Sequence, residues 1–312
     1  MRFAVVGAGG VGGYFGGRLA QGGADVAFIA RGATLEALRS GGLRVDSIHG
    51  DFALDRVVAT DNASDVGTVD VVLVAVKAWQ IREAAPGLAP LIGPATAVIP
   101  LENGLEAPDL LAVTLGRDHV LGGLCGIVSF IEKPGHIRHA GIDPFIMMGE
   151  LDNRRTQRAE SIAAAMKAAG VDAQIAPDIH RAMWTKFLFI APMSGVGAVT
   201  RVPVGIWRSM PEPRRMALEG LEEIGAIAVA RGVSLASDAI ERTMDRYDGL
   251  PSGSTSSLQR DLMAGKPSEL ESQIGAVVRL GRAAGVSTPV HDFLYAALLP
   301  AERIARGERP SL

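Results

Sequence analysis

The chain has 312 residues, of which 48% are hydrophobic and 21% are charged, a composition typical of a globular protein with room for two domains. Its formal charge of −3 comes from 31 basic and 34 acidic residues, so no basic excess points to a nucleic-acid partner. One cysteine, Cys125, excludes an internal disulfide and a multi-cysteine metal site. No apolar run reaches about eighteen residues, so we expect no membrane-spanning helix.

The sequence also argues against a metal site and against a signal peptide. His136 and His139 have no acidic neighbour at metal-ligand spacing in the sequence, so we expect no metal site. The N-terminal apolar run resembles a signal peptide, but glycines interrupt it. We therefore expect an unprocessed, cytoplasmic protein.

The N-terminus carries the pattern of a strand, a glycine-rich turn and a helix. Residues 1–6 are apolar except for Arg2, and the turn that follows consists of Gly7, Ala8, Gly9, Gly10, Val11 and Gly12. In this spacing the first glycine permits a tight turn, the second lets a pyrophosphate approach, and the third lets helix and strand pack closely. The pattern predicts a dinucleotide site at a helix N-terminus. A glycine-rich turn without a ligand is the alternative.

The end of the second predicted strand indicates which dinucleotide binds. NAD-binding proteins usually carry an acidic residue here, but this chain has Arg31 followed by Gly32. A guanidinium group offers a bidentate, charge-assisted contact to a 2′-phosphate. Arg31 therefore favours NADP, and a solvated arginine at a strand end is the alternative.

The first half of the chain alternates strand and helix patterns. Strands are expected at 1–6, 24–30, 43–46, 52–58, 70–76, 95–101 and 119–131, with a hairpin of 136–139 and 145–149, a helix at 158–169 and a strand at 171–175. This alternation predicts an α/β Rossmann domain with a doubly wound, mostly parallel sheet.

The second half is predicted to be all-helical. From Asp178, which can cap a helix, strand signals become scarce. Helices are expected at 178–191, 214–231, 237–247, 269–284 and 290–306. We therefore divide the chain into a dinucleotide domain, residues 1–177, and a helical domain, residues 178–312.

Lys186 is the strongest candidate for a catalytic side chain. Reduction of a ketone builds negative charge on oxygen, so the site needs a proton donor or a cation. Lys186 is the only charged residue between Ala182 and Thr200, and partial desolvation would make its ammonium a better acid. A lysine that extends to solvent from a helix edge is the alternative.

Other polar candidates lie after strands and in a serine-rich loop. Lys77 and Asn103 follow the fifth and sixth predicted strands, where ligands bind in such folds, although both could simply end a strand. The loop 254–257 could bind a carboxylate. The residues alone favour a helix cap there, followed by a solvated acidic face with Glu269 and Glu271.

Taken together, the chain resembles the ketopantoate reductase (2-dehydropantoate 2-reductase) family. The motifs that carry the resemblance are the glycine turn, Arg31-Gly32, Asn103-Gly104, Lys186, and the segments 256–261, 268–271 and 285–289. The resemblance implies NADPH-dependent reduction of a 2-oxo acid for pantothenate biosynthesis. It also implies a Rossmann domain joined to a helical domain like that of 6-phosphogluconate dehydrogenase.

The resemblance also implies roles for single residues. Lys186 would be the general acid, and Glu269 would hold the substrate hydroxyl. The expected substrate contacts are Asn103, Ser194 and Ser257, and the expected cofactor contacts outside the glycine turn are Arg31, Lys77, Asn103 and Glu269.

The chain departs from the family pattern beside the lysine. Family members usually carry asparagines four and eight residues after it, where this chain has Ile190 and Ser194, and glutamate replaces a glutamine at Glu102. An apolar side chain there would suit a less polar oxo acid than ketopantoate. A second alternative is a non-catalytic NADP sensor, which the presence of Lys186 and Glu269 disfavours. A homodimer is possible through the apolar C-terminal helix.

Overall fold

The computed structural model describes residues 1–308. They form two compact units: Met1–Glu102 with Glu106–Ile179, and Asn103–Leu105 with the chain from His180 onward. The short segment Asn103–Leu105 thus packs with the C-terminal residues although it lies between two stretches of the first unit. Each unit has its own hydrophobic core.

A five-stranded parallel sheet forms the centre of the first unit. Its strands are β5 (Val58–Thr60), β2 (Asp25–Ile29), β1 (Arg2–Val6), β6 (Val71–Val74) and β7 (Ala97–Pro100), in this spatial order. Every neighbouring pair is parallel. The central strands consist of almost uninterrupted apolar residues because helices cover both faces. The predicted α/β architecture is confirmed.

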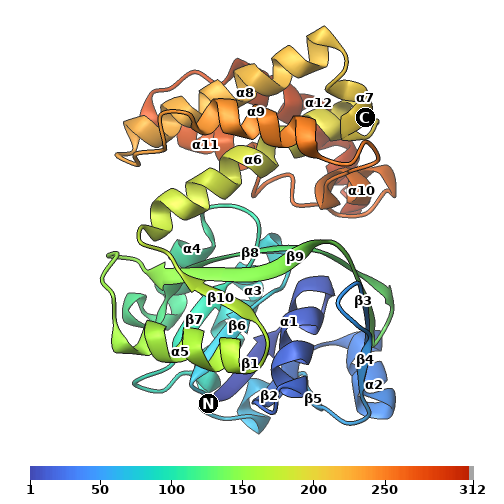
Figure 1. Ribbon diagram of the computed structural model, residues 1–312, viewed down its shortest axis with the longest axis vertical. Helices are drawn as coiled ribbons and strands as arrows, with labels where there is room; N and C mark the ends of the chain where they lie inside the picture. The colour runs from blue at the N-terminus through green and yellow to red at the C-terminus, as the bar shows by residue number, and fades with distance from the viewer. Residues whose placement is uncertain (309–312) are drawn as a thin grey trace. The chain divides into compact units, whose positions relative to one another are not determined.

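The helices of this unit follow the strands in the alternating order that the sequence predicts. They are α1 (Gly10–Gln21), α2 (Gly32–Gly41), α3 (Ile81–Ala84), α4 (Ala107–Leu115) and α5 (Gln157–Ala168). Helix α1 packs against β1, β2, β8 and β9 (Figure 1). This placement holds the start of α1 at the carboxyl end of β1, where the glycine turn lies.

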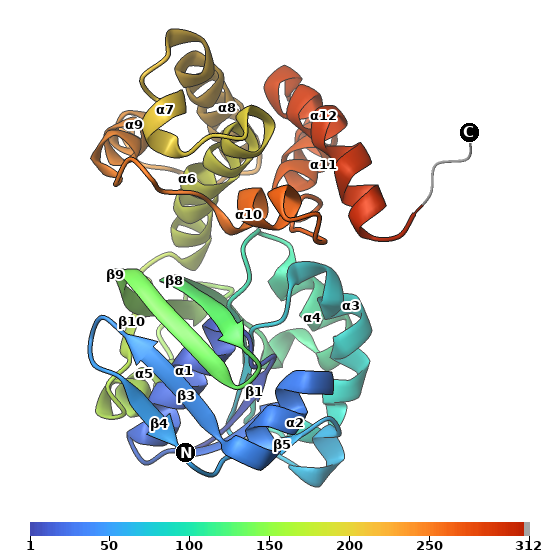
Figure 2. The ribbon, with the colours of Figure 1, turned by 90° about the vertical axis from the view of Figure 1, so that its right-hand side faces the viewer.

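A second sheet was not expected from the sequence. It consists of β10 (Asp172–Ile175), β9 (His136–Glu150), β3 (Leu43–Ser47) and β4 (Phe52–Leu54), with β8 (Leu121–Lys133) paired to β9. The two short strands predicted at 136–139 and 145–149 are one continuous strand, which forms a long antiparallel hairpin with β8 (Figure 2). A register shift between Gly126 and Val128 bends the hairpin without ending it.

The second unit is all-helical, as predicted. Its helices are α6 (Ile179–Thr200), α7 (Val204–Trp207), α8 (Pro211–Ala230), α9 (Ala239–Gly249), α10 (Ser257–Met263), α11 (Ile274–Ala284) and α12 (Pro289–Ala305). Trp207 and Tyr247 are the largest fully buried side chains of its core, and their rings meet edge to face. The Tyr247 hydroxyl donates to the Phe189 carbonyl, 2.6 Å away, which ties α9 to α6.

Two predicted helix boundaries were wrong by five residues or more. Helix α6 continues to Thr200 instead of ending at Ala191, and it accommodates Pro192 in its interior. Helix α11 begins at Ile274 rather than Glu269, because the residues from Glu269 to Gln273 form turns. Helix α6 is long and apolar enough to cross a membrane, but 67% of its most apolar window is buried inside the protein, as expected for a core helix.

Candidate active site

The glycine turn has the backbone geometry that the fingerprint requires. Gly7 has φ +93°, and a Cβ atom there would lie 2.8 Å from the Ala75 carbonyl oxygen. A Cβ atom on Gly12 would lie 2.0 Å from the Gly7 carbonyl oxygen, so helix and strand approach as closely as glycine allows. At Gly9, apart from its chain neighbours, no atom of residues 1–308 lies within 4 Å of the corresponding position. The turn is therefore closed on its packed side and open at its middle glycine.

The start of α1 supplies hydrogen-bond donors beside that opening. The first bond of the helix runs from the Gly13 amide to the Gly9 carbonyl, at 2.7 Å. The amides of Gly10, Val11 and Gly12 precede this bond and have no acceptor within the helix. Backbone N–H groups at a helix N-terminus, reachable past a glycine without a side chain, fit a pyrophosphate group.

Arg31 lies where the sequence predicted it, just after β2 and immediately before α2. Its guanidinium group donates to the Glu83 carboxylate at 3.0 Å. Both side chains are at least 70% exposed, so this ion pair contributes little to stability. Arg31 can therefore exchange Glu83 for another anion at small cost.

Lys77 lies beyond the end of β6, before a short 3-10 helix, Ala78–Gln80. Its backbone amide donates to the Gln80 side chain at 3.1 Å. Its ammonium nitrogen lies 5.7 Å from the centre of the Trp79 ring, within cation–π range. The carboxyl end of β6 thus carries a cation in the same unit as the glycine turn.

Lys186 lies on α6, in the helical unit. Its side chain is half-buried, and within residues 1–308 the structure records no hydrogen bond or ion pair for its ammonium group. The adjacent Phe187 is buried, and Ile190 follows one helical turn later on the same face. A cation on an apolar helix, with its donors available, is suited to protonating or stabilising a developing alkoxide.

The helical unit brings Asn103 and Glu269 together. The Asn103 amide nitrogen lies 3.5 Å from a Glu269 carboxylate oxygen, and the Gln273 amide nitrogen lies at the same distance from that oxygen. Glu269 is only 6% exposed, so the expectation of a solvated acidic face was wrong for this residue, whereas the Glu271 side chain is 45% exposed. Gly104, at φ +125°, allows this approach because a Cβ atom there would lie 2.8 Å from the Ser272 carbonyl oxygen.

The two predicted serines occupy different settings. Ser194 lies on α6, is fully buried, and its hydroxyl has no hydrogen-bond partner within residues 1–308. Ser257 is half-buried and is the first residue of α10, while the neighbouring Ser256 caps that helix by accepting from the Gln259 amide at 3.1 Å. The serine cluster therefore contains a helix cap and, next to it, a hydroxyl on the helix itself.

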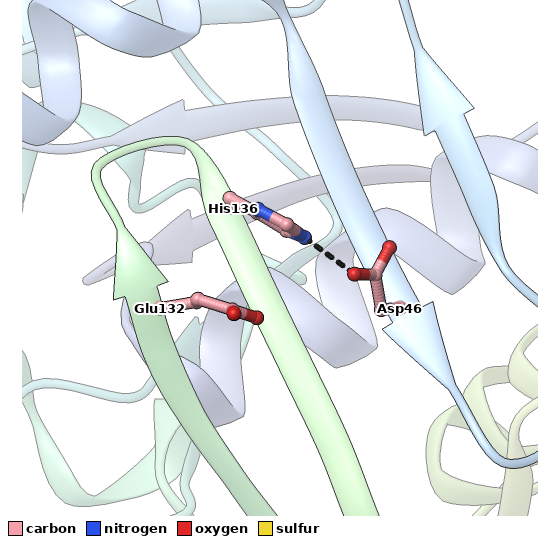
Figure 3. Close-up of side chains that lie close together, drawn as sticks. All are labelled: Asp46, Glu132 and His136. Carbon is pink, nitrogen blue, oxygen red and sulfur yellow. Dashed lines mark hydrogen bonds and ion pairs between the residues drawn. The ribbon is translucent and has the colours of Figure 1, made fainter.

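Sequence reasoning missed Gln273 and an acidic cluster around a histidine. Gln273 is fully buried and contacts Glu269, but its only signal in the sequence is its position four residues after that glutamate. The sequence showed no acidic partner of His136 at metal-ligand spacing, but in the fold Asp46 and Glu132 lie beside it (Figure 3). The Asp46 carboxylate is 2.9 Å from the His136 ring nitrogen.

This cluster has the makeup of an ion-pair network. Hydrogen bonds from Arg44, and then from His136, hold the pKa of Asp46 below its ordinary value despite some desolvation. The Arg138 guanidinium binds both Glu132 oxygens, at 2.8 and 3.1 Å, and lowers the pKa of Glu132 in the same way. Two guanidinium groups thus already neutralise the two carboxylates that a cation would need.

Both halves of the chain match family models. Residues 3–153 match the model described as Ketopantoate reductase PanE/ApbA, and residues 178–302 match Ketopantoate reductase PanE/ApbA C terminal. The first match includes the glycine turn, Arg31 and Lys77. The second includes Lys186 and Glu269.

Relatives match over nearly their whole length. An uncharacterized oxidoreductase of Bacillus subtilis is 30% identical over 298 residues, which cover 96% of this chain and 98% of that protein. A 2-dehydropantoate 2-reductase of Mesorhizobium japonicum is 30% identical over 317 residues, which cover 95% and 96%. A PanE/ApbA family ketopantoate reductase of Ralstonia eutropha has a solved structure that matches with a TM-score of 0.90 at 30% identity, over 98% of this chain and 100% of that one.

Proposed function

Because the chain belongs to the ketopantoate reductase family and is therefore an oxidoreductase, we propose that it reduces a 2-oxo acid to a 2-hydroxy acid with NADPH. The first substrate to test is 2-dehydropantoate. The observation that carries this proposal is the setting of Lys186, a half-buried cation on an apolar helix, in the same unit as the Asn103–Glu269 contact. Its ammonium group has no hydrogen-bond or ion-pair partner among residues 1–308.

The first unit would hold the cofactor. The open position at Gly9 and the free amides at the start of α1 fit the pyrophosphate, and the exposed Arg31 fits the 2′-phosphate of NADPH. Lys77 would lie near the nicotinamide end. When bound, NADPH supplies the hydride for the carbonyl carbon.

The helical unit would bind the oxo acid and supply the proton. Lys186 would donate its proton to the carbonyl oxygen as negative charge develops there. Asn103, Ser194 and Ser257 would orient the substrate through an amide and two hydroxyl groups. Glu269, held beside Asn103, would accept a hydrogen bond from a substrate hydroxyl and contact the cofactor.

The direct test is the loss of NADPH absorbance with 2-dehydropantoate and a panel of 2-oxo acids. Lys186→Ala should lower kcat by about a hundred-fold or more while the Kd for NADPH changes little, because the lysine acts on the substrate. Lys167→Ala, at an exposed position of α5, is the matched control and should keep wild-type activity. Equal losses of turnover and NADPH affinity in Lys186→Ala would refute its role as the acid.

A less polar 2-oxo acid is the second candidate substrate, and Ile190 favours it. Its apolar side chain lies one turn from Lys186, where an amide would otherwise meet a substrate hydroxyl. The decisive pair is 2-dehydropantoate and 3,3-dimethyl-2-oxobutanoate, which differ only by that hydroxyl. A higher kcat/KM for the second compound, reversed by Ile190→Asn, would establish the less polar substrate.

The proposed function also implies the binding partners, the cellular location and the oligomeric state of the protein. A small-molecule oxo acid is the partner that the family implies, and we propose that the enzyme works in the cytoplasm, without nucleic acid or membrane. We also propose a homodimer, which size-exclusion chromatography with light scattering would test. A single monomer mass across concentrations would exclude it.

A further inference from the structure

A buried carboxylate holds the residue that precedes Glu269. Glu302, on α12, is 1% exposed. Its two oxygens accept from the backbone amide of Ser268 at 3.1 and 3.0 Å, and one of them accepts from the Ser268 hydroxyl at 2.5 Å. Ser268 is itself fully buried. A carboxylate that binds an amide and a hydroxyl of one residue fixes the position of that residue's backbone.

Arg306 completes this arrangement from the next turn of the helix. Its guanidinium nitrogen Nε lies 2.6 Å from a Glu302 oxygen, and another of its nitrogens donates to the Ser268 carbonyl at 3.0 Å. The amide, hydroxyl and carbonyl groups of Ser268 are therefore all bound by Glu302 and Arg306, and we call these three residues the Ser268 clamp. Charge-assisted hydrogen bonds of this kind are about twice as strong as neutral ones.

The segment beside the clamp has no regular structure to hold it. The residues from Glu269 to Gln273 form turns, and α11 begins only at Ile274. The Asn103 and Gln273 amides lie 3.5 Å from the Glu269 carboxylate, at the outer limit of a hydrogen bond. Short, charged contacts fix this backbone on both sides of Glu269: Glu302 and Arg306 bind Ser268, and the Arg279 guanidinium donates to the Glu271 carbonyl at 2.9 Å.

We propose that Glu302 and Arg306 are positioning residues of the reductase, which act through Ser268 to keep the Glu269 carboxylate beside Asn103. This inference rests on the proposed function, because it assigns Glu269 to substrate binding. Displacement of a binding group by about 1 Å can lower activity by about a hundred-fold. The clamp would therefore serve the site through the backbone of Ser268 and Glu269 rather than through a substrate contact of its own.

The chain offers a matched control for a purely structural role. Glu223, on α8, is the carboxylate that holds the other end of α12: it accepts from the Val290 amide at 2.6 Å and from the His291 ring at 2.5 Å. It is 8% exposed, so it is buried to a similar degree as Glu302. Replacing either acid by glutamine removes one buried carboxylate at one end of the same helix, but only Glu302 binds the residue next to Glu269.

The experiment compares Glu302→Gln and Glu223→Gln in the full-length protein, by Tm, by the Kd for NADPH, and by kcat and KM for the best oxo acid. We expect both variants to lower Tm. Glu302→Gln should lower kcat/KM for the oxo acid by about ten- to a hundred-fold with NADPH affinity kept, and Glu223→Gln should change kcat/KM by less than about three-fold. Equal losses of kcat/KM in the two variants would overturn the inference.

A second variant and the activity of the wild-type protein make the result of this experiment unambiguous. If Glu302→Gln does not fold, Arg306→Lys serves instead, because it keeps the charge and removes the guanidinium group that binds both Glu302 and the Ser268 carbonyl. It should lower kcat/KM for the oxo acid, and unchanged kcat/KM would count against the clamp. A wild-type protein that binds NADPH but reduces no 2-oxo acid would remove the proposed function and this inference together. If the wild-type protein reduces an oxo acid but Glu302→Gln and Glu223→Gln lose kcat/KM equally, the inference about the clamp fails and the proposed function stands.

Discussion

The side-chain amide of Asn103 lies 3.5 Å from the carboxylate of Glu269, although 166 residues separate them in the sequence. The contact joins the loop after the last parallel strand to the turn before α11. It exists because Asn103–Leu105 packs with the helical unit rather than with β7, which precedes it, or α4, which follows it. An amide, which donates hydrogen bonds, and a carboxylate, which accepts them, lie side by side here. Such a pair can bind a hydroxyl group, which both donates and accepts.

This contact predicts a distinctive pH dependence for Asn103→Asp. The variant places two carboxylates about as far apart as the amide and the carboxylate now are, and a like charge raises the pKa of at least one of them. We expect kcat/KM to fall by about ten-fold or more at pH 8 and to recover in part near pH 6, where the shared proton restores a donor. Asn103→Ala is the control and should lose activity equally at both pH values. A uniform loss in Asn103→Asp would argue against direct contact.

The Arg31–Glu83 pair predicts how cofactor preference can be changed in either direction. Arg31→Ala should weaken NADPH binding by about ten-fold or more and leave NADH nearly unchanged, because only NADPH carries the 2′-phosphate. Glu83→Gln should strengthen NADPH binding, since the guanidinium then loses its competing anion. Isothermal titration calorimetry with both cofactors measures the ratio of the Kd for NADH to the Kd for NADPH. An unchanged ratio in Arg31→Ala would withdraw NADP as the preferred cofactor.

Glu150 predicts part of the acid sensitivity of the first unit. Burial raises the pKa of this carboxyl, but hydrogen bonds from Arg158 and Thr156 and the Arg158 charge outweigh it and hold the pKa below its ordinary value of 4.5. The stabilisation is therefore complete above the unfolded pKa and is lost as the pH falls through the folded one. Glu150→Gln should destabilise the protein at pH 7 by about 1–3 kcal/mol.

Denaturant unfolding at several pH values measures this effect. The gap in unfolding free energy between wild type and Glu150→Gln should shrink as the pH falls below about 4.5, because the wild-type carboxyl then loses its charge. Glu160→Gln removes the exposed ion pair with Arg155 and should have almost no effect at any pH. A gap that stays constant between pH 7 and pH 3 would show that the charge of Glu150 is not what stabilises the unit.

Local periodicity was sufficient to predict the parallel sheet, the helical second half and the glycine turn. Strands such as Val71–Val74 are recognisable because burial on both faces leaves an uninterrupted apolar run. The second sheet escaped prediction because its long hairpin, β8 and β9, alternates buried and exposed residues irregularly and contains glycines. The pairing of distant strands depends on tertiary packing, which cannot be read from a short segment of the sequence.

The candidate site was only partly predictable for the same reason. Lys186 stands out because it is the only charged residue between Ala182 and Thr200. Glu269, in contrast, looks like an ordinary surface acid until the fold buries it. Glu302 is recognisable from its spacing in the sequence. It follows Leu294 and Leu298 at intervals of four residues, so it lies on the buried face of α12, and a buried charge needs a partner. Its partner, Ser268, lies 34 residues away and emerges only from the folded structure.

Gly104 predicts that the geometry of the Asn103 loop is indispensable. At φ +125° a side chain is strained, and a Cβ atom would lie 2.8 Å from the Ser272 carbonyl oxygen, which is backbone and cannot turn away. Gly104→Ala should therefore push Asn103 away from Glu269 and lower kcat/KM for the oxo acid by about a hundred-fold, with a stability loss of roughly 1–3 kcal/mol.

The matched control for this variant is Gly67→Ala in the first unit. Gly67 also has a positive φ, +69°, but no atom lies within 4 Å of its would-be Cβ position, so alanine there adds backbone strain without a clash. It should lower Tm slightly and leave kcat/KM unchanged. Steady-state kinetics and thermal unfolding of both variants separate the two effects. If Gly104→Ala kept wild-type kcat/KM, the close packing of the Asn103 loop on the Glu269–Gln273 turn would have no role in catalysis.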